Sequence, residues 1–257
     1  MNRRDFLNLS KIGILLGTTT MSSNLFANQP PEIRSSYFYI PENKLSYFNS
    51  IRQKLTKIQR YVGYGNFNIL GFDDALKIAS RVSHIGKFTK NELDFIEYIF
   101  YYNPSFHGFY GKKIATNLTD TINNKDVYKV PGTGHYLFKG HPLETYNEMI
   151  KDIGNSLVLT SGIRSVVKQM KLFFDKIASV NGNITIAAIS LAPPAYTYHF
   201  IGDFDVGKRG FGYSNFTSRF ALTDEFKKIR KLSYVNVRYT VNNKDGVRYE
   251  PWHITTI

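Results

Sequence analysis

Apolar positions in the first half of the chain recur at the spacing of an α-helix. After Pro41 they appear every three or four residues with Lys and Arg between them, which predicts an amphipathic helix that ends at Gly63. A second helix is predicted over residues 73–82. A third begins at Thr89, which has the spacing of a capping box with Glu92. The pattern therefore predicts an α-helical N-terminal region.

The second half of the chain mixes short apolar runs with helical segments and turn residues. Residues 103–135 are rich in Gly, Asn and Thr, which is typical of loops with short strands. We expect an α+β fold in which a small antiparallel sheet is flanked by helices, beside the helical N-terminal region. The predicted elements are helices over 142–153, after Ser165 and over 224–232, strands over 157–160 and 184–191, and a hairpin of strands 235–241 and 247–253 around a turn at 242–246.

The N-terminus has the features of an export signal. Arg3 and Arg4 precede a moderately apolar run from Ile12 to Met21, in a pattern that resembles a twin-arginine signal. Ala27 is the expected last signal residue, and an ordinary amphipathic helix is the alternative. We expect residues 1–27 to direct export, with the periplasm as the compartment and no stable membrane insertion once they are removed.

Composition narrows the chemistry that is available. The 257 residues are 42% hydrophobic and 15% aromatic, which is typical of a globular protein. Cysteine is absent, so any metal must be bound by His, Asp or Glu. The net charge of +13 fits an anionic partner such as a cell-wall polymer, or solubility alone. The basic residues are spread along the chain without a nucleic-acid motif, so no nucleic-acid partner is expected.

Three residues in the last sixty could hold a catalytic zinc ion. His199, Asp205 and His253 would supply the three protein ligands of such a site and leave a fourth position for water. Glu250 is the candidate general base. Residues three apart on a regular strand face opposite sides, but Pro251 interrupts the strand and would let Glu250 and His253 reach the same ion.

An arginine on a predicted loop completes this set. Arg164 follows the strand over 157–160 and could bind a substrate carboxylate or stabilise an oxyanion. Gln169 lies in the first turns of the following helix. Ser165 and Gln169 have two alternative roles, which are contact with the substrate and capping of the helix.

Three motifs together resemble the VanY-type D-alanyl-D-alanine carboxypeptidases and the related LdcB-like L,D-carboxypeptidases, which are zinc peptidases. The motifs are Ser161-Gly162-Ile163-Arg164-Ser165, then Tyr196-Thr197-Tyr198-His199-Phe200-Ile201-Gly202 with Asp205, and finally Glu250-Pro251-Trp252-His253. The resemblance covers roughly residues 155–257. It predicts three segments: a signal over 1–27, a helical region over 28–155 and a zinc carboxypeptidase domain over 156–257.

The resemblance implies a role for each motif residue. His199, Asp205 and His253 would bind one Zn²⁺ ion, and Glu250 would be the general base. Substrate contacts are implied for Arg164, Gln169 and Thr197, with Ser165 beside them in the same turn. The implied activity is removal of a C-terminal D-alanine from peptidoglycan stem peptides, through attack by a water molecule on zinc.

The sequence departs from the family pattern at three points. Ile163 stands where an aromatic residue is usual, and Thr197 stands where serine is usual but keeps the hydroxyl group. The segment between His199 and Asp205 is one residue shorter than is usual, which makes Asp203 a rival ligand. We prefer Asp205 because an apolar residue, Val206, follows it as in the family.

Two other functions compete with the carboxypeptidase. An endopeptidase that cuts peptidoglycan crosslinks would need a groove open at both ends, and a non-catalytic cell-wall binding module would need the groove but no metal. The D,D or L,D specificity and the oligomeric state stay open.

Overall fold

The computed structural model describes residues 37–256. The predicted signal, residues 1–27, lies outside the described residues and stays a prediction. None of the helices within 37–256 is both long and apolar enough to cross a lipid bilayer.

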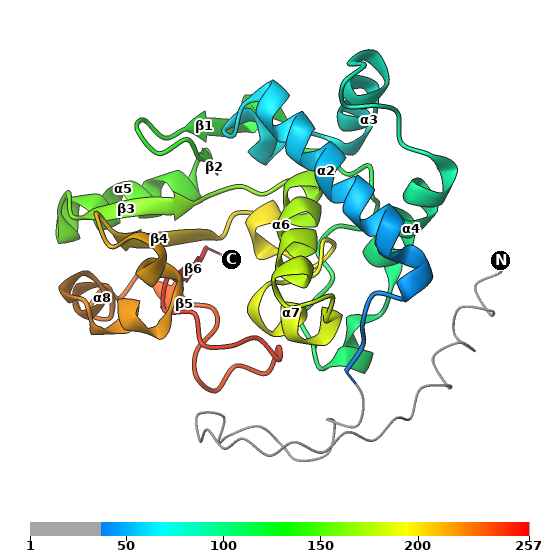
Figure 1. The fold of residues 1–257 in the computed structure, drawn as a ribbon. Coiled ribbons are helices and arrows are strands. Elements are labelled where there is room, and N and C mark those ends of the chain that lie inside the picture. Colours follow the sequence, from blue (N-terminus) through cyan, green and yellow to red (C-terminus); the bar gives the residue numbers. More distant parts are fainter. Residues whose placement is uncertain (1–36, 257) are drawn as a thin grey trace. The chain divides into compact units, whose positions relative to one another are not determined.

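The helical N-terminal region is present as predicted. Helix α2 spans Leu45–Val62, α3 spans Phe72–Arg81 and α4 spans Lys90–Tyr101 (Figure 1). The capping box at the start of α4 is confirmed, because the Thr89 side chain accepts from the backbone N–H of Glu92 while the Glu92 carboxylate accepts from the backbone N–H of Thr89.

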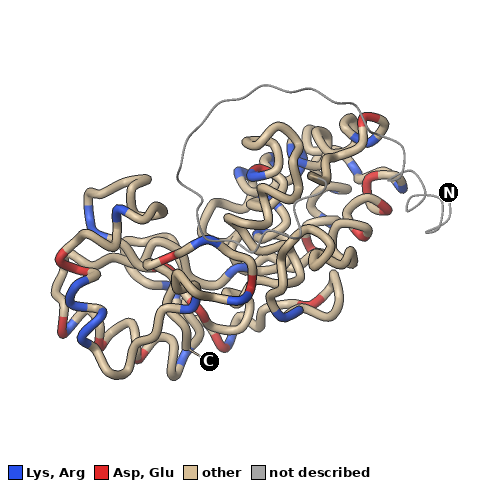
Figure 2. Tube along the Cα trace, turned by 90° about the horizontal axis from the view of Figure 1, so that it is seen from below, with Lys and Arg blue, Asp and Glu red and all other residues tan. Residues whose placement is uncertain are grey.

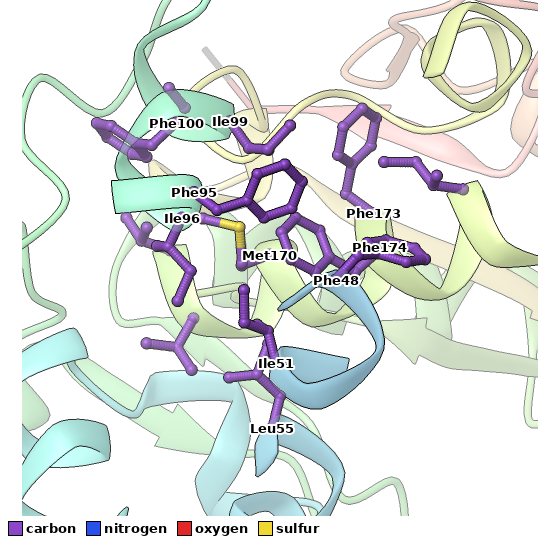
Figure 3. Packing of buried hydrophobic residues seen from close by; sticks show 14 of the residues in the cluster. Phe48, Ile51, Leu55, Phe95, Ile96, Ile99, Phe100, Met170, Phe173 and Phe174 are labelled. Carbon is purple, nitrogen blue, oxygen red and sulfur yellow. The ribbon is translucent and has the colours of Figure 1, made fainter. Parts of the chain in front are cut away.

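The N-terminal helices share a hydrophobic core with later elements. Helix α6, Val166–Ser179, and helix α7, Ile184–Ser190, contribute to the same cluster as α2 and α4. Figure 3 shows the centre of this cluster, where aromatic and aliphatic side chains from α2, α4 and α6 interlock. The labelled residues are Phe48, Ile51, Leu55, Phe95, Ile96, Ile99, Phe100, Met170, Phe173 and Phe174. This core spans the predicted boundary at residues 155/156, and that division into domains stays a prediction.

A four-stranded antiparallel sheet forms the other part of the fold. Its order is β3 (Leu157–Ser161), β4 (Phe204–Lys208), β6 (His253–Thr255) and β5 (Asn236–Val237). Strands β1 (Val127–Lys129) and β2 (Tyr136–Phe138) make a separate hairpin. Helices α5 (His141–Ile153) and α8 (Asp224–Ile229) contribute side chains to a second core with β3, β4 and β6. The predicted α+β class, with a small antiparallel sheet and a helical N-terminal region, is confirmed.

Short 3₁₀ helices link these elements. They are η1 (Glu42–Lys44), η2 (Asn66–Ile69), η3 (Pro104–His107), η4 (Asn124–Asp126), η5 (Tyr198–Phe200), η6 (Gly212–Phe216) and η7 (Ser218–Leu222).

The strand predicted over residues 184–191 is wrong, because this segment is helix α7. Asn183 caps it by accepting a hydrogen bond from the backbone N–H of Ile186. The buried residues Ile184, Ala187 and Ala188 recur at helical spacing. A short apolar run does not by itself distinguish a buried strand from a buried helix, and here the cap decides for the helix.

The predicted C-terminal hairpin is also wrong in its extent and register. Strand β5 covers only residues 236–237 and pairs with residues 254–255 of β6. The regular strand pairing therefore lies C-terminal to residue 252, whereas the prediction placed it over residues 247–253. Outside the regular strands the two arms of the hairpin still bond to each other, from Arg238 N–H to His253 C=O at 3.0 Å and from Glu250 N–H to Tyr239 C=O at 2.9 Å. Other backbone groups of the segment 238–252 bond elsewhere in the fold, as in the donation from Arg248 N–H to Ile189 C=O at 2.8 Å. Helix α8 likewise ends at Ile229, earlier than predicted.

Charged residues of both signs are scattered over the chain. Figure 2 shows Lys and Arg positions distributed along the tube with Asp and Glu between them.

We predict that Glu92 stabilises the N-terminal region. Its buried carboxylate accepts from Lys54 Nζ at 2.6 Å as well as from the Thr89 N–H. Glu92→Ala removes the cap and leaves the poorly exposed ammonium of Lys54 without its carboxylate partner, although the ammonium keeps its bond to the Lys87 carbonyl. The free energy of unfolding should therefore fall by about 2–4 kcal/mol in urea denaturation followed by circular dichroism.

The exposed pair Lys90–Asp94 on the same helix provides the control. Asp94→Ala should change the free energy of unfolding by less than about 0.5 kcal/mol. Burial alone would raise the pKa of Glu92, but hydrogen bonds from Lys54 and Thr89 lower it overall. The Glu92 contribution should therefore be complete above the unfolded-state pKa of about 4.3 and be lost as the pH falls through the lower folded-state value. An equal effect of the two substitutions would contradict this role.

Candidate metal centre

The three candidate ligands come from three separate elements. His199 lies in η5, Asp205 in β4 and His253 at the start of β6. Antiparallel pairing of β4 with β6 places Asp205 directly opposite His253. Gly202, with φ of 142°, lies between η5 and β4, and a side chain there would meet the Thr256 hydroxyl at 3.0 Å. The pairing of β4 with β6 therefore brings Asp205 and His253 together, which their spacing in the sequence does not reveal.

The donor atoms of the three side chains converge on one point. His199, Asp205 and His253 each offer an atom within 4.8 Å of the others. His199 Nε2 lies 3.3 Å from Asp205 Oδ1, and His253 Nδ1 lies 3.5 Å from the same oxygen. All three residues are buried, with exposed fractions of 1%, 2% and 4% respectively.

Two of these buried atoms have no hydrogen-bond partner among the described residues. They are His199 Nε2 and Asp205 Oδ1, which face each other across the centre. Buried polar atoms are nearly always paired, so this pair marks a place for a ligand that accepts their lone pairs. Two imidazole nitrogens and one carboxylate oxygen are the donor set of a catalytic zinc site. The residues present therefore fit a zinc ion.

Hydrogen bonds on the far side of each imidazole set its orientation. His199 Nδ1 lies 2.8 Å from the carbonyl oxygen of Gly162, which can only accept, so the proton is on Nδ1 and the Nε2 lone pair faces the centre. His253 Nε2 lies 3.0 Å from Asp203 Oδ2, and its Nδ1 faces the centre in the same way. Such outer partners orient metal-binding histidines and increase their basicity.

This arrangement separates the roles of the two aspartates. Asp203 is held by the guanidinium of Arg238, and its Oδ1 accepts from the backbone N–H of Thr256 at 3.2 Å. Its carboxylate thus lies behind His253, whereas the carboxylate of Asp205 lies between the two histidines. The geometry favours Asp205 as the ligand and Asp203 as the partner of His253.

The charges around the centre shift the pKa values of its residues in opposite directions. Burial, together with the positive charge of Arg164, lowers the pKa of His199 to about 4. Burial alone would lower the pKa of His253 as well, but its bonds to Asp203 and Glu250 and the charge of Asp205 raise it to about 9. Despite burial, His199 and Arg164 hold the pKa of Asp205 well below its usual range, and His253 and Arg238 lower that of Asp203 to about 2.

Glu250 reaches the centre through a tight turn. The backbone N–H of His253 donates to the carbonyl of Glu250 at 3.1 Å, with Pro251 and Trp252 in the turn. Glu250 Oε2 then lies 3.7 Å from His253 Nδ1. The interruption expected at Pro251 is present, and the acid and the histidine face the same point.

Arg164 extends from the loop between β3 and α6 toward the same point. Its Nε donates to Ser161 Oγ at 2.8 Å, and its terminal nitrogen forms an ion pair with Asp205 Oδ2. Gly162 is required in this loop because a Cβ there would lie only 2.0 Å from the carbonyl oxygen of Tyr136. The close approach brings Ile163 N–H to that oxygen at 2.8 Å and fixes the loop.

A small cavity connects these groups with the predicted substrate residues. Gln169 donates from Nε2 to the Ala192 carbonyl at 2.6 Å, while its Oε1 is buried without a partner among the described residues. Ser165 is completely buried, and its hydroxyl caps α6 by accepting from the backbone N–H of Lys168. The cavity is lined by Arg164, Gln169, Leu191, Ala192, Thr197, His199, Tyr239, Val247, Glu250 and His253.

Sequence reasoning missed several residues around the centre. Tyr239 lines the cavity with its ring 4.8 Å from that of His253, and Arg238 holds Asp203. His135 is near enough that the charges of Lys168 and Arg164, after burial, help lower its pKa to about 4. No motif or periodicity marks these positions, because tertiary contacts alone bring them to the centre.

Comparison with known proteins supports the resemblance seen in the sequence. Residues 141–256 match the VanY family, described as D-alanyl-D-alanine carboxypeptidase. No curated protein matches the chain. The predicted resemblance to VanY-type carboxypeptidases is therefore confirmed over residues 141–256.

Three solved structures of peptidases are similar to the chain. The LD-carboxypeptidase LdcB, whose structure concerns peptidoglycan recognition, is 24% identical over 53% of this chain and 70% of its own, with a TM-score of 0.43. VanYB with D-alanine-D-alanine is 19% identical over 56% and 85%, with a TM-score of 0.39. A variant of the vancomycin-resistance D,D-pentapeptidase VanY with Zn(II) is 19% identical over 56% and 86%, with a TM-score of 0.38.

We predict different effects on metal binding for the two aspartates. Asp205→Ala removes a donor atom from the centre and should abolish retention of zinc after dialysis, as measured by plasma mass spectrometry. Asp203→Asn keeps all three donors but weakens the partner of His253, so the zinc Kd should rise by about 10- to 100-fold. A loss of zinc with Asp203→Asn alone, and not with Asp205→Ala, would reverse the assignment.

Proposed function

We infer that this chain, whose residues 141–256 match the VanY family, is an exported zinc carboxypeptidase that removes a C-terminal D-alanine from peptidoglycan stem peptides. One observation carries the catalytic part of this proposal. The unpartnered buried atoms His199 Nε2 and Asp205 Oδ1 converge with His253 Nδ1 beside the carboxylate of Glu250.

Each residue of the centre has a distinct part in peptide hydrolysis. His199, Asp205 and His253 would hold the zinc ion, which when bound supplies Lewis acidity that acidifies water and polarises the scissile carbonyl. Glu250, through Oε2, takes a proton from the water that attacks the carbonyl carbon and returns a proton to the leaving nitrogen as the C–N bond breaks. The products are a peptide with a new carboxylate and a free amino acid.

The cavity residues supply recognition of the substrate end. The guanidinium of Arg164 can bind a C-terminal carboxylate or the developing oxyanion. Gln169 has a free buried acceptor, and Thr197 lines the same cavity. The Tyr239 hydroxyl remains protonated, because burial and the charge of Glu250 raise its pKa well above its ordinary value, so it can donate a hydrogen bond to a bound peptide.

We predict that Glu250→Gln keeps zinc and loses catalysis. The amide matches the carboxylate in shape but cannot accept the proton, so kcat should fall by about 10²- to 10⁴-fold while the zinc content stays near that of the natural protein. The assay is mass spectrometry of products from defined tripeptide, tetrapeptide and pentapeptide stems.

The same assay distinguishes the competing specificities. Loss of only the fifth residue identifies a D,D-carboxypeptidase, and loss of the fourth identifies an L,D-carboxypeptidase. Cleavage of a crosslinked dimer in place of the stems would identify an endopeptidase. Full activity in Glu250→Gln would refute the proposed base, and a protein that binds cell wall without zinc or products would be a binding module.

We propose export through the twin-arginine route from the sequence of residues 1–27. This route carries folded proteins and would suit an enzyme loaded with metal before export. Arg3→Lys together with Arg4→Lys should retain the protein in the cytoplasm of a Gram-negative host, as judged by fractionation and immunoblotting. An Arg60→Lys, Arg81→Lys variant, altered at two described helix-end positions outside the signal, is the control and should be exported normally. Normal export of the Arg3, Arg4 variant would exclude the twin-arginine route.

A further inference from the structure

Arg248 lies beside the proposed base and is not part of any motif that the sequence revealed. Its Nε is 3.5 Å from Glu250 Oε1. Glu250 Oε2, the other oxygen, is the one that lies 3.7 Å from His253 Nδ1. The two oxygens of one carboxylate therefore have different neighbours, an arginine on one side and the metal centre on the other.

This division matters because the terminal torsion of a glutamate is soft. Rotation about its last bond is governed by a broad, roughly two-fold preference, so a carboxylate without partners does not hold one orientation. Glu250 is mostly buried, with 8% of its surface exposed, and burial of an ionised carboxylate requires a compensating partner. Arg248 supplies the positive charge and a direction.

Arg248 is itself held in place by contacts on several sides. One terminal nitrogen donates to the carbonyl of Phe216 at 3.1 Å, and the guanidinium lies 5.3 Å from the ring centroid of Trp252. Its backbone N–H donates to the carbonyl of Ile189 at 2.8 Å. The Nε–H is buried and makes no hydrogen bond to a described residue, and Glu250 Oε1 lies within ion-pair distance of it.

We propose that Arg248 is a positioning residue, which holds Glu250 Oε1 so that Oε2 faces the metal centre. This proposal rests on the proposed function, since it needs Glu250 as the base. It adds a residue that acts through Glu250 and does not touch the reacting atoms. A contact with the substrate is the competing role, because the Arg248 side chain is 38% exposed.

Arg248→Met tests the proposal because it keeps much of the length of the side chain and removes the charge. We expect kcat to fall by about 10- to 100-fold, the range that a small misplacement of a catalytic group can cause, with KM changed less than about twofold and zinc content unchanged. Arg248→Lys should recover part of kcat. Arg209→Met is the matched control, since Arg209 also binds a backbone carbonyl, that of Asn155 at 3.1 Å, but lies outside the cavity.

A double-mutant cycle separates action through Glu250 from a direct role. If Arg248 acts only by holding Glu250, then Arg248→Met added to Glu250→Gln should reduce the residual rate less than about twofold. An additional loss equal to that of the single substitution would overturn the proposal. A rise in KM without a fall in kcat would also overturn it and assign Arg248 to the substrate.

Crystal structures give a result that does not depend on activity. In Arg248→Met, the Glu250 carboxylate should leave its orientation or occupy two orientations, while His199, Asp205 and His253 stay in place. An unchanged Glu250 side chain would refute the positioning role. If the natural protein proves inactive on every stem peptide, the proposed function fails, and this structural comparison still decides whether Arg248 orients Glu250.

Discussion

Burial of three carboxylates within one centre is the constraint on which the rest of the site depends. Asp203, Asp205 and Glu250 are all buried, and an ionised carboxylate in the interior is costly unless it is paired. Each has its own arginine within ion-pair distance: Arg238 with Asp203, Arg164 with Asp205, and Arg248 with Glu250. These arginines come from the loop after β3 and from the segment between β5 and β6. The ion pairs that offset the cost of burying these carboxylates therefore also connect the elements that form the centre.

The N-terminal region, in which the sequence shows no chemistry, supports the loop that carries Arg164. Ser165 N–H donates to the carbonyl of Asn68 at 2.7 Å, and Ile163 N–H donates to that of Tyr136 at 2.8 Å. Both acceptors lie outside the family match over residues 141–256. Helices α2 and α4 also pack on α6, which begins at this loop. Backbone acceptors have no residue type of their own, so a sequence pattern cannot reveal this support.

Local signals were reliable at the start of α4, where a capping side chain and its backbone partner are close in sequence. The capping box at Thr89 and Glu92 could be predicted because both partners lie within one turn of helix. The segment Ile184–Ser190 was mistaken for a strand because a short apolar run fits either structure. The C-terminal hairpin failed for a different reason. Strand register depends on pairing across the chain, and β6 pairs with β4 and β5 only through residues 253–255.

The sequence alone determined which chemical groups are available: two histidines and carboxylates for a metal, an acid three residues before His253, and an arginine after an apolar strand. It also determined the helical N-terminal region and the α+β class, since these follow from local periodicity. Tertiary structure decided how those groups are used. Pairing of β4 with β6 set Asp205 beside His253, and this placed Asp203 behind the ring. Packing also set the ring of Tyr239 beside that of His253. The physical reason is that distance and orientation between remote residues depend on strand register and packing, which no single stretch of sequence contains.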